Sequence, residues 1–239
     1  MSISTILLLA LIAYLIGSIS FARLVARLAA GKDVTQLEIP VEGTQDSYKV
    51  FSIGGNSVAA LLGARAGLIT GVADILKIYL PTLACKWLYP GEPILVMVVA
   101  LAGFLGHIYP IYHRFHGGSG FSAILGGLLA IDPLAALATP VLGLLLGLFV
   151  FRNMIAMTLS WIWLLIPWFW LRTGGDPVYI LYAVGVNVLF ILAMIPEARM
   201  AFKYIQEGKS AEFGLGSLKA HPMGRGMLKM AKYFKVEIK

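Results

Sequence analysis

Long stretches without a charged side chain are the feature that most constrains how this chain folds. A helix needs about 20 apolar residues to cross the hydrocarbon core of a bilayer. Six windows without Asp, Glu, Lys or Arg are close to this length: Met1–Ala22, Pro93–His113, Phe115–Ile131, Pro133–Phe151, Asn153–Leu171 and Pro177–Pro196. A seventh segment, Gly67–Leu88, is apolar apart from Asp74, Lys77 and Lys86. We therefore predict an all-α integral membrane protein with about seven transmembrane helices.

The composition excludes the main alternatives. Of the 239 residues, 59% are hydrophobic and 13% are charged, whereas a soluble domain carries about 25% charged residues. A disordered chain would have far less apolar surface. The single cysteine, Cys85, rules out a disulfide framework. The first window has no basic segment before it and no A-x-A-like site, so we do not expect a cleavable signal peptide.

The distribution of Lys and Arg predicts the orientation in the membrane. Basic residues concentrate in cytoplasmic connections. If seven spans alternate in direction, one side of the membrane receives the stretch Arg23–Arg65, Arg114, Arg152 and the tail after Pro196. Of the 19 basic residues, only Lys77, Lys86 and Arg172 lie outside these segments. We therefore expect the N-terminus outside the cell and the C-terminus in the cytoplasm.

Two segments are expected to lie outside the membrane. The first is a cytoplasmic loop, 32–66, in which acidic residues, proline and glycine are mixed. The second is a basic cytoplasmic tail, 197–239, which follows a membrane domain that spans 1–196. The tail carries nine basic and four acidic residues.

The end of the tail has a helical pattern. Over 227–239 the apolar and basic side chains alternate at helical spacing: Met227, Met230, Ala231, Phe234 and Ile238 against Lys229, Lys232, Lys235 and Lys239. This pattern is typical of a helix that lies on an anionic membrane surface. It also fits a solvated basic tail without fixed structure, and the sequence does not separate the two.

The first polar cluster near a predicted cytoplasmic end is Ser52-Ile-Gly-Gly-Asn56-Ser57. Backbone N–H groups of a glycine-rich turn before a helix converge on an anion, and Asn56 adds a side-chain donor. Glycine turns before helices are also common without any ligand. The cluster lacks the Gly-Lys-Ser/Thr ending of a Walker loop.

The second cluster runs from Gly106-His107 to a glycine-rich stretch. Gly117, Gly118, Ser119 and Gly120 lead directly into the short apolar run 121–131, and Ser122 follows them. A short helix that begins inside the protein directs its N–H groups and positive dipole end inward, which suits a phosphate or a carboxylate. Packing of small residues between helices is the alternative explanation.

Charged and metal-ligating residues give weaker indications. His107, His113 and His116 have no Asp, Glu or Cys nearby to complete a site, so we predict no metal. Asp74 and Lys77 lie on one face of an otherwise apolar span. Charges in a span usually face the interior and pair with each other, so this pair is expected either to be structural or to position the glycine loops.

In this order, the motifs resemble those of the bacterial acyl-phosphate-dependent glycerol-3-phosphate acyltransferases, the PlsY family. The resemblance covers roughly 12–152. The matching residues are Gly17-Ser18-Ile19-Ser20-Phe21, Gly55-Asn56, Leu62-Gly63, Ala66-Gly67, Asp74-Ile75-Leu76-Lys77, Gly106-His107, Pro110, Phe115, Gly117-Gly118, Gly120, Asp132-Pro133 and Arg152. The chain differs from the family at His116 and Ser119, where the family has lysines, and in an insertion around Pro40–Val50.

The resemblance implies seven spans and transfer of a fatty acyl group from acyl-phosphate to glycerol 3-phosphate, which forms lysophosphatidic acid for phospholipid synthesis. It implies a location in the inner (plasma) membrane of a bacterial-type cell, with the site facing the cytoplasm. It also implies membrane lipids as partners, and neither a cofactor nor nucleic acid. The catalytic candidates are His107 and Asn56, and structural support is expected from Ser18, Asp74 and Lys77. The predicted phosphate-binding residues are Gly55, Asn56, Gly117, Gly118, Ser119, Gly120, Ser122 and Arg152.

Two other functions fit the sequence. A catalytically degenerate relative would keep the helical bundle as a lipid-binding or partner-binding membrane protein, which the missing lysines and the basic tail favour. A small transporter would use Asp74 and Lys77, but no inverted repeat supports it.

Overall fold

A computed structural model describes residues 2–31, 34–40, 47–49, 52–208 and 222–236. Nearly all of the regular structure is helical, and a two-stranded antiparallel hairpin is the exception. The elements are α1 Ile3–Gly17, α2 Phe21–Ala30, a 3-10 turn Val34–Gln36, β1 Glu38–Pro40, β2 Ser47–Lys49, α3 Gly55–Leu62, α4 Ala64–Leu88, α5 Pro93–Ile108, a 3-10 turn Ile111–His113, α6 Phe121–Ile131, α7 Pro133–Leu145, a π-helical segment η3 Leu146–Phe151, α8 Met154–Trp163, α9 Leu165–Thr173, α10 Pro177–Gln206 and α12 Pro222–Tyr233.

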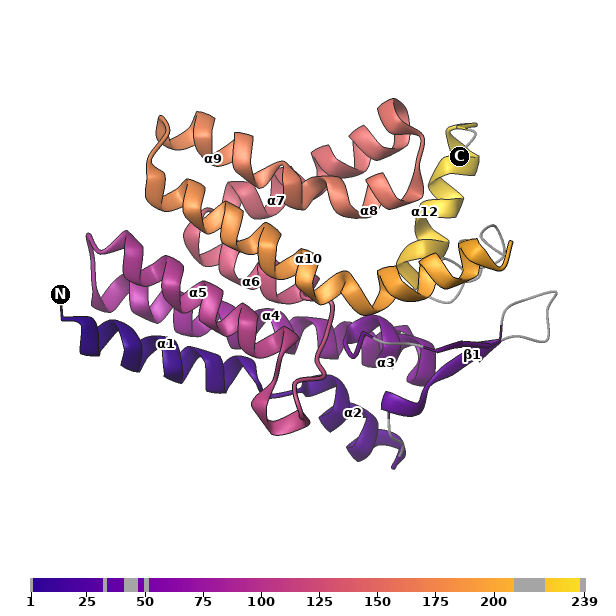
Figure 1. Ribbon diagram of the computed structural model, residues 1–239, viewed down its shortest axis with the longest axis horizontal. Coiled ribbons are helices and arrows are strands. Elements are labelled where there is room, and N and C mark those ends of the chain that lie inside the picture. Colours follow the sequence, from indigo (N-terminus) through magenta and orange to yellow (C-terminus); the bar gives the residue numbers. More distant parts are fainter. Residues whose placement is uncertain (1, 32–33, 41–46, 50–51, 209–221, 237–239) are drawn as a thin grey trace.

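The long helices run side by side (Figure 1). Helix α1 packs on α5, and α4 packs on both α5 and α6. Helices α7, α8 and α9 form a second group, and α10 contacts both α5 and α9. The short helix α6 is largely buried, with its glycines and alanines against α4 and α5. The main hydrophobic core therefore surrounds α6.

The predicted all-α membrane fold is confirmed. Among the described residues, five helices are long and apolar enough to span a membrane: Ile3–Ala30, Ala64–Leu88, Pro93–His113, Pro133–Phe151 and Pro177–Met200. Many of their large apolar side chains point outward, including Leu7, Leu11 and Leu181. Such exposure is costly in water but is expected against lipid.

Two of the seven expected spans have a different form. The window 115–131 contains only the short helix α6, because the glycine stretch before it remains a loop. The window 153–171 is divided into α8 and α9 at Leu164. Pro167 has no N–H to donate to the carbonyl of Trp163, which favours a break at this point. The count of seven spans and the outside N-terminus remain predictions.

The polar segments are more ordered than the sequence suggests. The loop 32–66 contains the hairpin and α3, although part of the predicted insertion around Pro40–Val50 lies outside the described residues. Helix α10 continues to Gln206, so the predicted boundary at residue 196 falls inside one helix. The helical alternative for the tail agrees with α12, while Ile238 and Lys239 lie outside the described residues.

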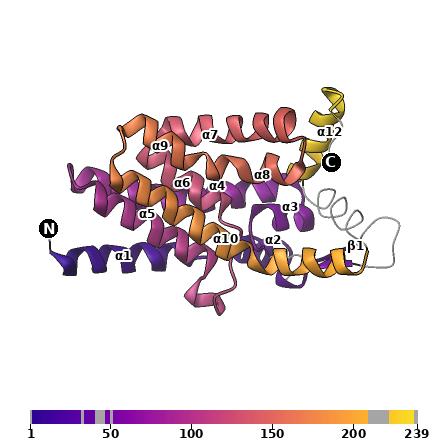
Figure 2. The same ribbon diagram turned by 45° about the horizontal axis from the view of Figure 1, so that its top comes forward.

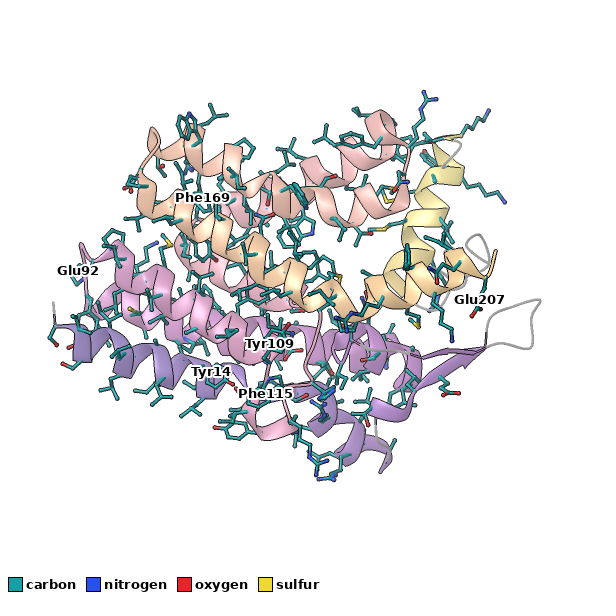
Figure 3. The ribbon with its side chains drawn as sticks, in the orientation of Figure 1. Tyr14, Glu92, Tyr109, Phe115, Phe169 and Glu207 are labelled. Carbon is teal, nitrogen blue, oxygen red and sulfur yellow. The ribbon has the colours of Figure 1, made fainter. Side chains whose placement is uncertain are left out.

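The bundle has two distinct ends. Figure 3 places Glu92 at one end, in the α4–α5 connection, and Glu207 at the other. Helices α2 and α3, the hairpin and α12 all gather at the end marked by Glu207 (Figures 1 and 2). We call it the polar end.

Candidate active site

A cleft lies where the turn after α1 meets α4, α5 and the glycine loop. It encloses about 190 Å³ of empty space, which includes open solvent. The residues that line it come from five separate segments: Gly17, Ser18, Ile19, Ser20, Ile53, Asp74, Lys77, His107, Pro110, Gly117 and Gly118.

The wall formed by α1 depends on close backbone contact. A Cβ atom at Gly17 would overlap the carbonyl oxygen of Gly103, and one at Gly106 would overlap that of Tyr14. The hydroxyl of Ser18 donates to the Tyr14 carbonyl at 2.8 Å and accepts from the Ile111 N–H at 3.4 Å. Ser18 thereby joins the end of α1 to the loop after α5.

The two tyrosines on this wall connect three helices. The Tyr14 hydroxyl donates to the carbonyl of Tyr109 at 2.9 Å, and the Tyr109 hydroxyl donates to that of Leu192 on α10 at 3.1 Å. Figure 3 shows Tyr14 and Tyr109 close together, with Phe115 beyond them on the outer side of the loop. The entry to the glycine loop is therefore fixed to α1 and α10.

Asp74 and Lys77 form a buried ion pair on α4. Lys77 Nζ lies 2.8 Å from Asp74 Oδ1 and donates to the carbonyl of Ile19 at 2.6 Å. The carboxylate also lies 3.7 Å from Nδ1 of His107. The pair therefore connects α4 to the turn after α1 and to His107. Among the described residues, Nδ1 of His107 is buried without a hydrogen-bond partner.

The two predicted glycine clusters lie side by side. The N–H of Gly118 donates to the carbonyl of His107 at 3.2 Å, and the N–H of Ile53 donates to that of Gly117 at 3.1 Å. A Cβ atom at Gly117 would overlap the His107 carbonyl, and one at Gly118 would overlap the His107 imidazole. The loop fits against α5 because both positions lack side chains.

Helix α6 begins where this loop ends. Gly120 precedes α6 with φ +93°, a left-handed conformation that favours glycine. Ser122, in the first turn, faces Gly71 of α4. The N-terminus of α6 therefore lies beside the glycine loop, as predicted.

Several predicted binding residues do not line the cleft. Asn56 is exposed in the first turn of α3, and Gly55 packs against Gly67 of α4. Ser119 is not part of the lining. Arg152 is exposed at the end of η3, next to Phe151, and the structure does not bring it to the cleft.

One cation at the loop was missed by sequence reasoning. Arg23, on α2, donates from Nη2 to the carbonyl of His116 at 2.8 Å. This contact brings a guanidinium to the start of the glycine loop, next to the position where the resemblance led us to expect a lysine. The two residues are 93 positions apart, and only the turn at Ser18–Ser20 brings them together. The sequence carries no local signal for this contact.

The described residues include no group of three His, Cys, Asp or Glu side chains arranged to hold a metal ion. The groups at the cleft are backbone N–H groups, the Asp74–Lys77 pair and the His107 imidazole, and the Arg23 guanidinium lies at the start of the glycine loop. Donors of this kind suit an anion such as a phosphate.

Comparison with known proteins gives a consistent result. Residues 7–208 match the model of the family described as glycerol-3-phosphate acyltransferase. The glycerol-3-phosphate acyltransferase of Cupriavidus necator is 32% identical over 211 residues, which cover 87% of this chain and 96% of that protein. The corresponding protein of Cupriavidus metallidurans is 30% identical over the same length and the same shares.

Solved structures agree with this assignment. A crystal structure of PlsY (YgiH), an integral membrane glycerol 3-phosphate acyltransferase, in its glycerol 3-phosphate form has a TM-score of 0.64 and 27% identity, and the match covers 86% of this chain and 94% of that one. The lysophosphatidic acid form of the same enzyme gives a TM-score of 0.63. This chain belongs to the glycerol-3-phosphate acyltransferase family of integral membrane proteins.

Proposed function

We propose that this protein transfers a fatty acyl group from acyl-phosphate to the 1-hydroxyl of glycerol 3-phosphate. The observation that carries the proposal is the arrangement of Gly117 and Gly118, with Arg23 beside them, against a buried His107. The solved relatives, in forms with glycerol 3-phosphate and with lysophosphatidic acid, support the same acceptor and product. The acyl-phosphate donor rests on the resemblance of the motifs.

At the acyl carbon, the reaction forms one bond and breaks one. The hydroxyl oxygen of glycerol 3-phosphate bonds to the acyl carbon, and the bond from that carbon to the phosphate oxygen breaks. Inorganic phosphate leaves, and the hydroxyl proton passes to Nδ1 of His107, the nitrogen without a hydrogen-bond partner among the described residues. The carboxylate of Asp74, at 3.7 Å, stabilises the imidazolium that results.

The two anionic substrates need positive charge and N–H donors. The N-terminus of α6 and the backbone of the glycine loop supply donors, and Arg23 supplies a charge close to the loop. We assign Arg23 the role that Arg152 was expected to have, because Arg23 contacts the loop directly. Asn56 stays a candidate on α3, although its exposed side chain does not line the cleft.

The proposed site faces the cytoplasm of a bacterial-type cell. Helices α2 and α12 lie at the polar end (Figure 1), and they carry Arg23, Arg27, Arg225, Lys229 and Lys232. Positive charge of this kind favours the cytoplasmic side of the inner membrane. Glycerol 3-phosphate would then enter from the cytoplasm and the acyl chain from the bilayer.

A catalytically degenerate relative is the second candidate, favoured by the absence of lysine at His116 and Ser119. The test is purified protein in nanodiscs, incubated with glycerol 3-phosphate and either acyl-phosphate or acyl-CoA. We expect lysophosphatidic acid from acyl-phosphate alone. Binding of the acyl chain without product would support the degenerate relative, and product from acyl-CoA alone would contradict the proposed donor.

A further inference from the structure

Helix α12 lies outside the part of the chain that matches the acyltransferase family. The match ends at residue 208, and α12 spans Pro222–Tyr233. Its role therefore does not follow from the reaction that the family shares.

The apolar face of α12 is docked on the protein. Ala231 is buried against Leu148 and Met157, with Met227 and Leu228 packed at the edge of the same cluster. The ring of Phe234 meets that of Phe149 edge-on, with 5.5 Å between the centroids. These contacts fix α12 to the ends of α7, η3 and α8.

Helix α12 lies across the bundle rather than along it. Figures 1 and 2 both show it crossing the polar end, while α1, α4, α5 and α10 run along the bundle. If the long helices span the bilayer, α12 lies close to the plane of the membrane surface. This is the geometry of an interfacial helix.

The outer surface of α12 carries charge of one sign. Lys229 and Lys232 are exposed on the helix, and Lys235 is exposed just after it. Arg225 is also exposed and lies one turn before Lys229, on the same face. The segment 222–236 contains no acidic residue. A surface of this kind attracts an anionic partner.

Aromatic side chains accompany the lysines. Tyr233 is 82% exposed, Phe151 at the end of η3 is 59% exposed, and Phe234 is 48% exposed. Tyrosine, with an apolar ring and a polar hydroxyl, favours the level of the lipid headgroups, and phenylalanine is common on the apolar face of interfacial helices. Exposed aromatic and basic side chains together therefore favour a membrane surface over a soluble acidic protein.

We infer that the basic face of α12 binds the headgroups of anionic phospholipids in the leaflet at the polar end of the bundle. Electrostatic attraction supplies the specificity for anionic lipid, and the exposed aromatic rings insert between the headgroups. The docked apolar face holds the helix at the level where both contacts form.

The test uses the full chain in nanodiscs, with an environment-sensitive fluorophore on Gly226→Cys and with the native buried cysteine removed by Cys85→Ala. Gly226 is suitable because a side chain there meets no atom within 4 Å. The probe lipids carry a nitroxide at the headgroup, in phosphatidylcholine alone or mixed with phosphatidylglycerol. We expect quenching to increase when phosphatidylglycerol is present and to decrease at high salt.

Two matched variants separate charge from structure. Lysine near an anionic surface strengthens binding about fivefold per residue. Lys229→Gln with Lys232→Gln and Lys235→Gln should therefore weaken the binding of phosphatidylglycerol by on the order of 100-fold, seen as a loss of the quenching that depends on this lipid. The corresponding triple arginine variant should retain that quenching. Equal quenching with and without phosphatidylglycerol, or an unchanged response in the glutamine variant, would overturn the inference.

Discussion

Gly118 contacts His107 twice, once through the backbone and once through the imidazole. Its N–H donates to the His107 carbonyl at 3.2 Å, and its α-carbon faces Nε2 so closely that a Cβ atom would overlap the ring. The glycine loop and the proposed proton acceptor are therefore positioned as one unit. Moving either residue moves the other.

This contact predicts that Gly118→Ala strongly slows acyl transfer while the bundle stays folded. The added methyl displaces the imidazole or the loop, and a misplacement of about 1 Å costs on the order of 100-fold in rate. The measurement is the rate of lysophosphatidic acid formation, with the melting temperature as the check on folding. Gly226→Ala, on α12 in open space, is the control and should keep full activity.

His107→Asn should lower kcat about 100-fold, because the amide cannot take up the hydroxyl proton. The buried imidazole nitrogen has no hydrogen-bond partner among the described residues, so its loss should cost little stability. Steady-state kinetics with acyl-phosphate, together with thermal unfolding, give both quantities. A variant with normal kcat would remove His107 from the mechanism.

Arg23→Gln should raise the KM for a phosphate-bearing substrate by about 10-fold or more, since a charge-assisted hydrogen bond contributes about 1.5–3 kcal/mol. Arg27→Gln is the matched control, one turn further along α2 and exposed. Arg23→Lys should restore part of the binding, because it keeps the charge but loses the guanidinium geometry. Equal KM values for the Arg23→Gln and Arg27→Gln variants would contradict the role of Arg23.

Asp132, at the opposite end of the bundle, should make the stability of the protein depend on pH. Burial alone would raise the pKa of the Asp132 carboxyl, but hydrogen bonds from Trp168 at 3.1 Å and Arg172 at 2.9 Å, with one from the Ala135 N–H, outweigh burial and lower it. A lowered folded-state pKa stabilises the protein above the unfolded value of about 4 and ceases to do so as the pH falls through the folded value.

We therefore expect the melting temperature in detergent to fall as the pH is lowered below about 4. Asp132→Asn should be less stable by a few degrees at neutral pH and should show a shallower decrease in acid. Since this residue lies far from the cleft, the variant should keep its acyltransferase activity at neutral pH. Parallel pH profiles for the two proteins would show that Asp132 does not cause the acid sensitivity.

Most of the long apolar helices could be predicted because a bilayer excludes charge, so the absence of Asp, Glu, Lys and Arg over long windows is a direct physical signal. The glycine clusters could be predicted as special positions, although not as neighbours. Their contact through Ile53 and Gly117 joins segments that are far apart in the chain. No periodicity in the sequence encodes it.

The role of Arg23 and the absence of Arg152 from the cleft could not be predicted for a related reason. Both residues lie at helix ends, and the direction of a side chain there depends on how the chain turns. The turn at Ser18–Ser20 directs α2 toward the loop, while the π-helical end of η3 leaves Arg152 in the left-handed region with φ 49°. Motif order identifies residue types at such positions but not the direction in which they point.

The contact between Gly17 and Gly103 determines which parts of α1 tolerate change. A selection for growth from a library randomised over this helix should accept many apolar residues at Leu7, Leu8 and Leu11, which are exposed, because lipid tails do not discriminate among hydrocarbon shapes. At position 17 the same selection should recover glycine alone, because any side chain there separates the two backbones. As this enzyme adapts to a new lipid environment, most positions of α1 can therefore be substituted, whereas its last turn cannot.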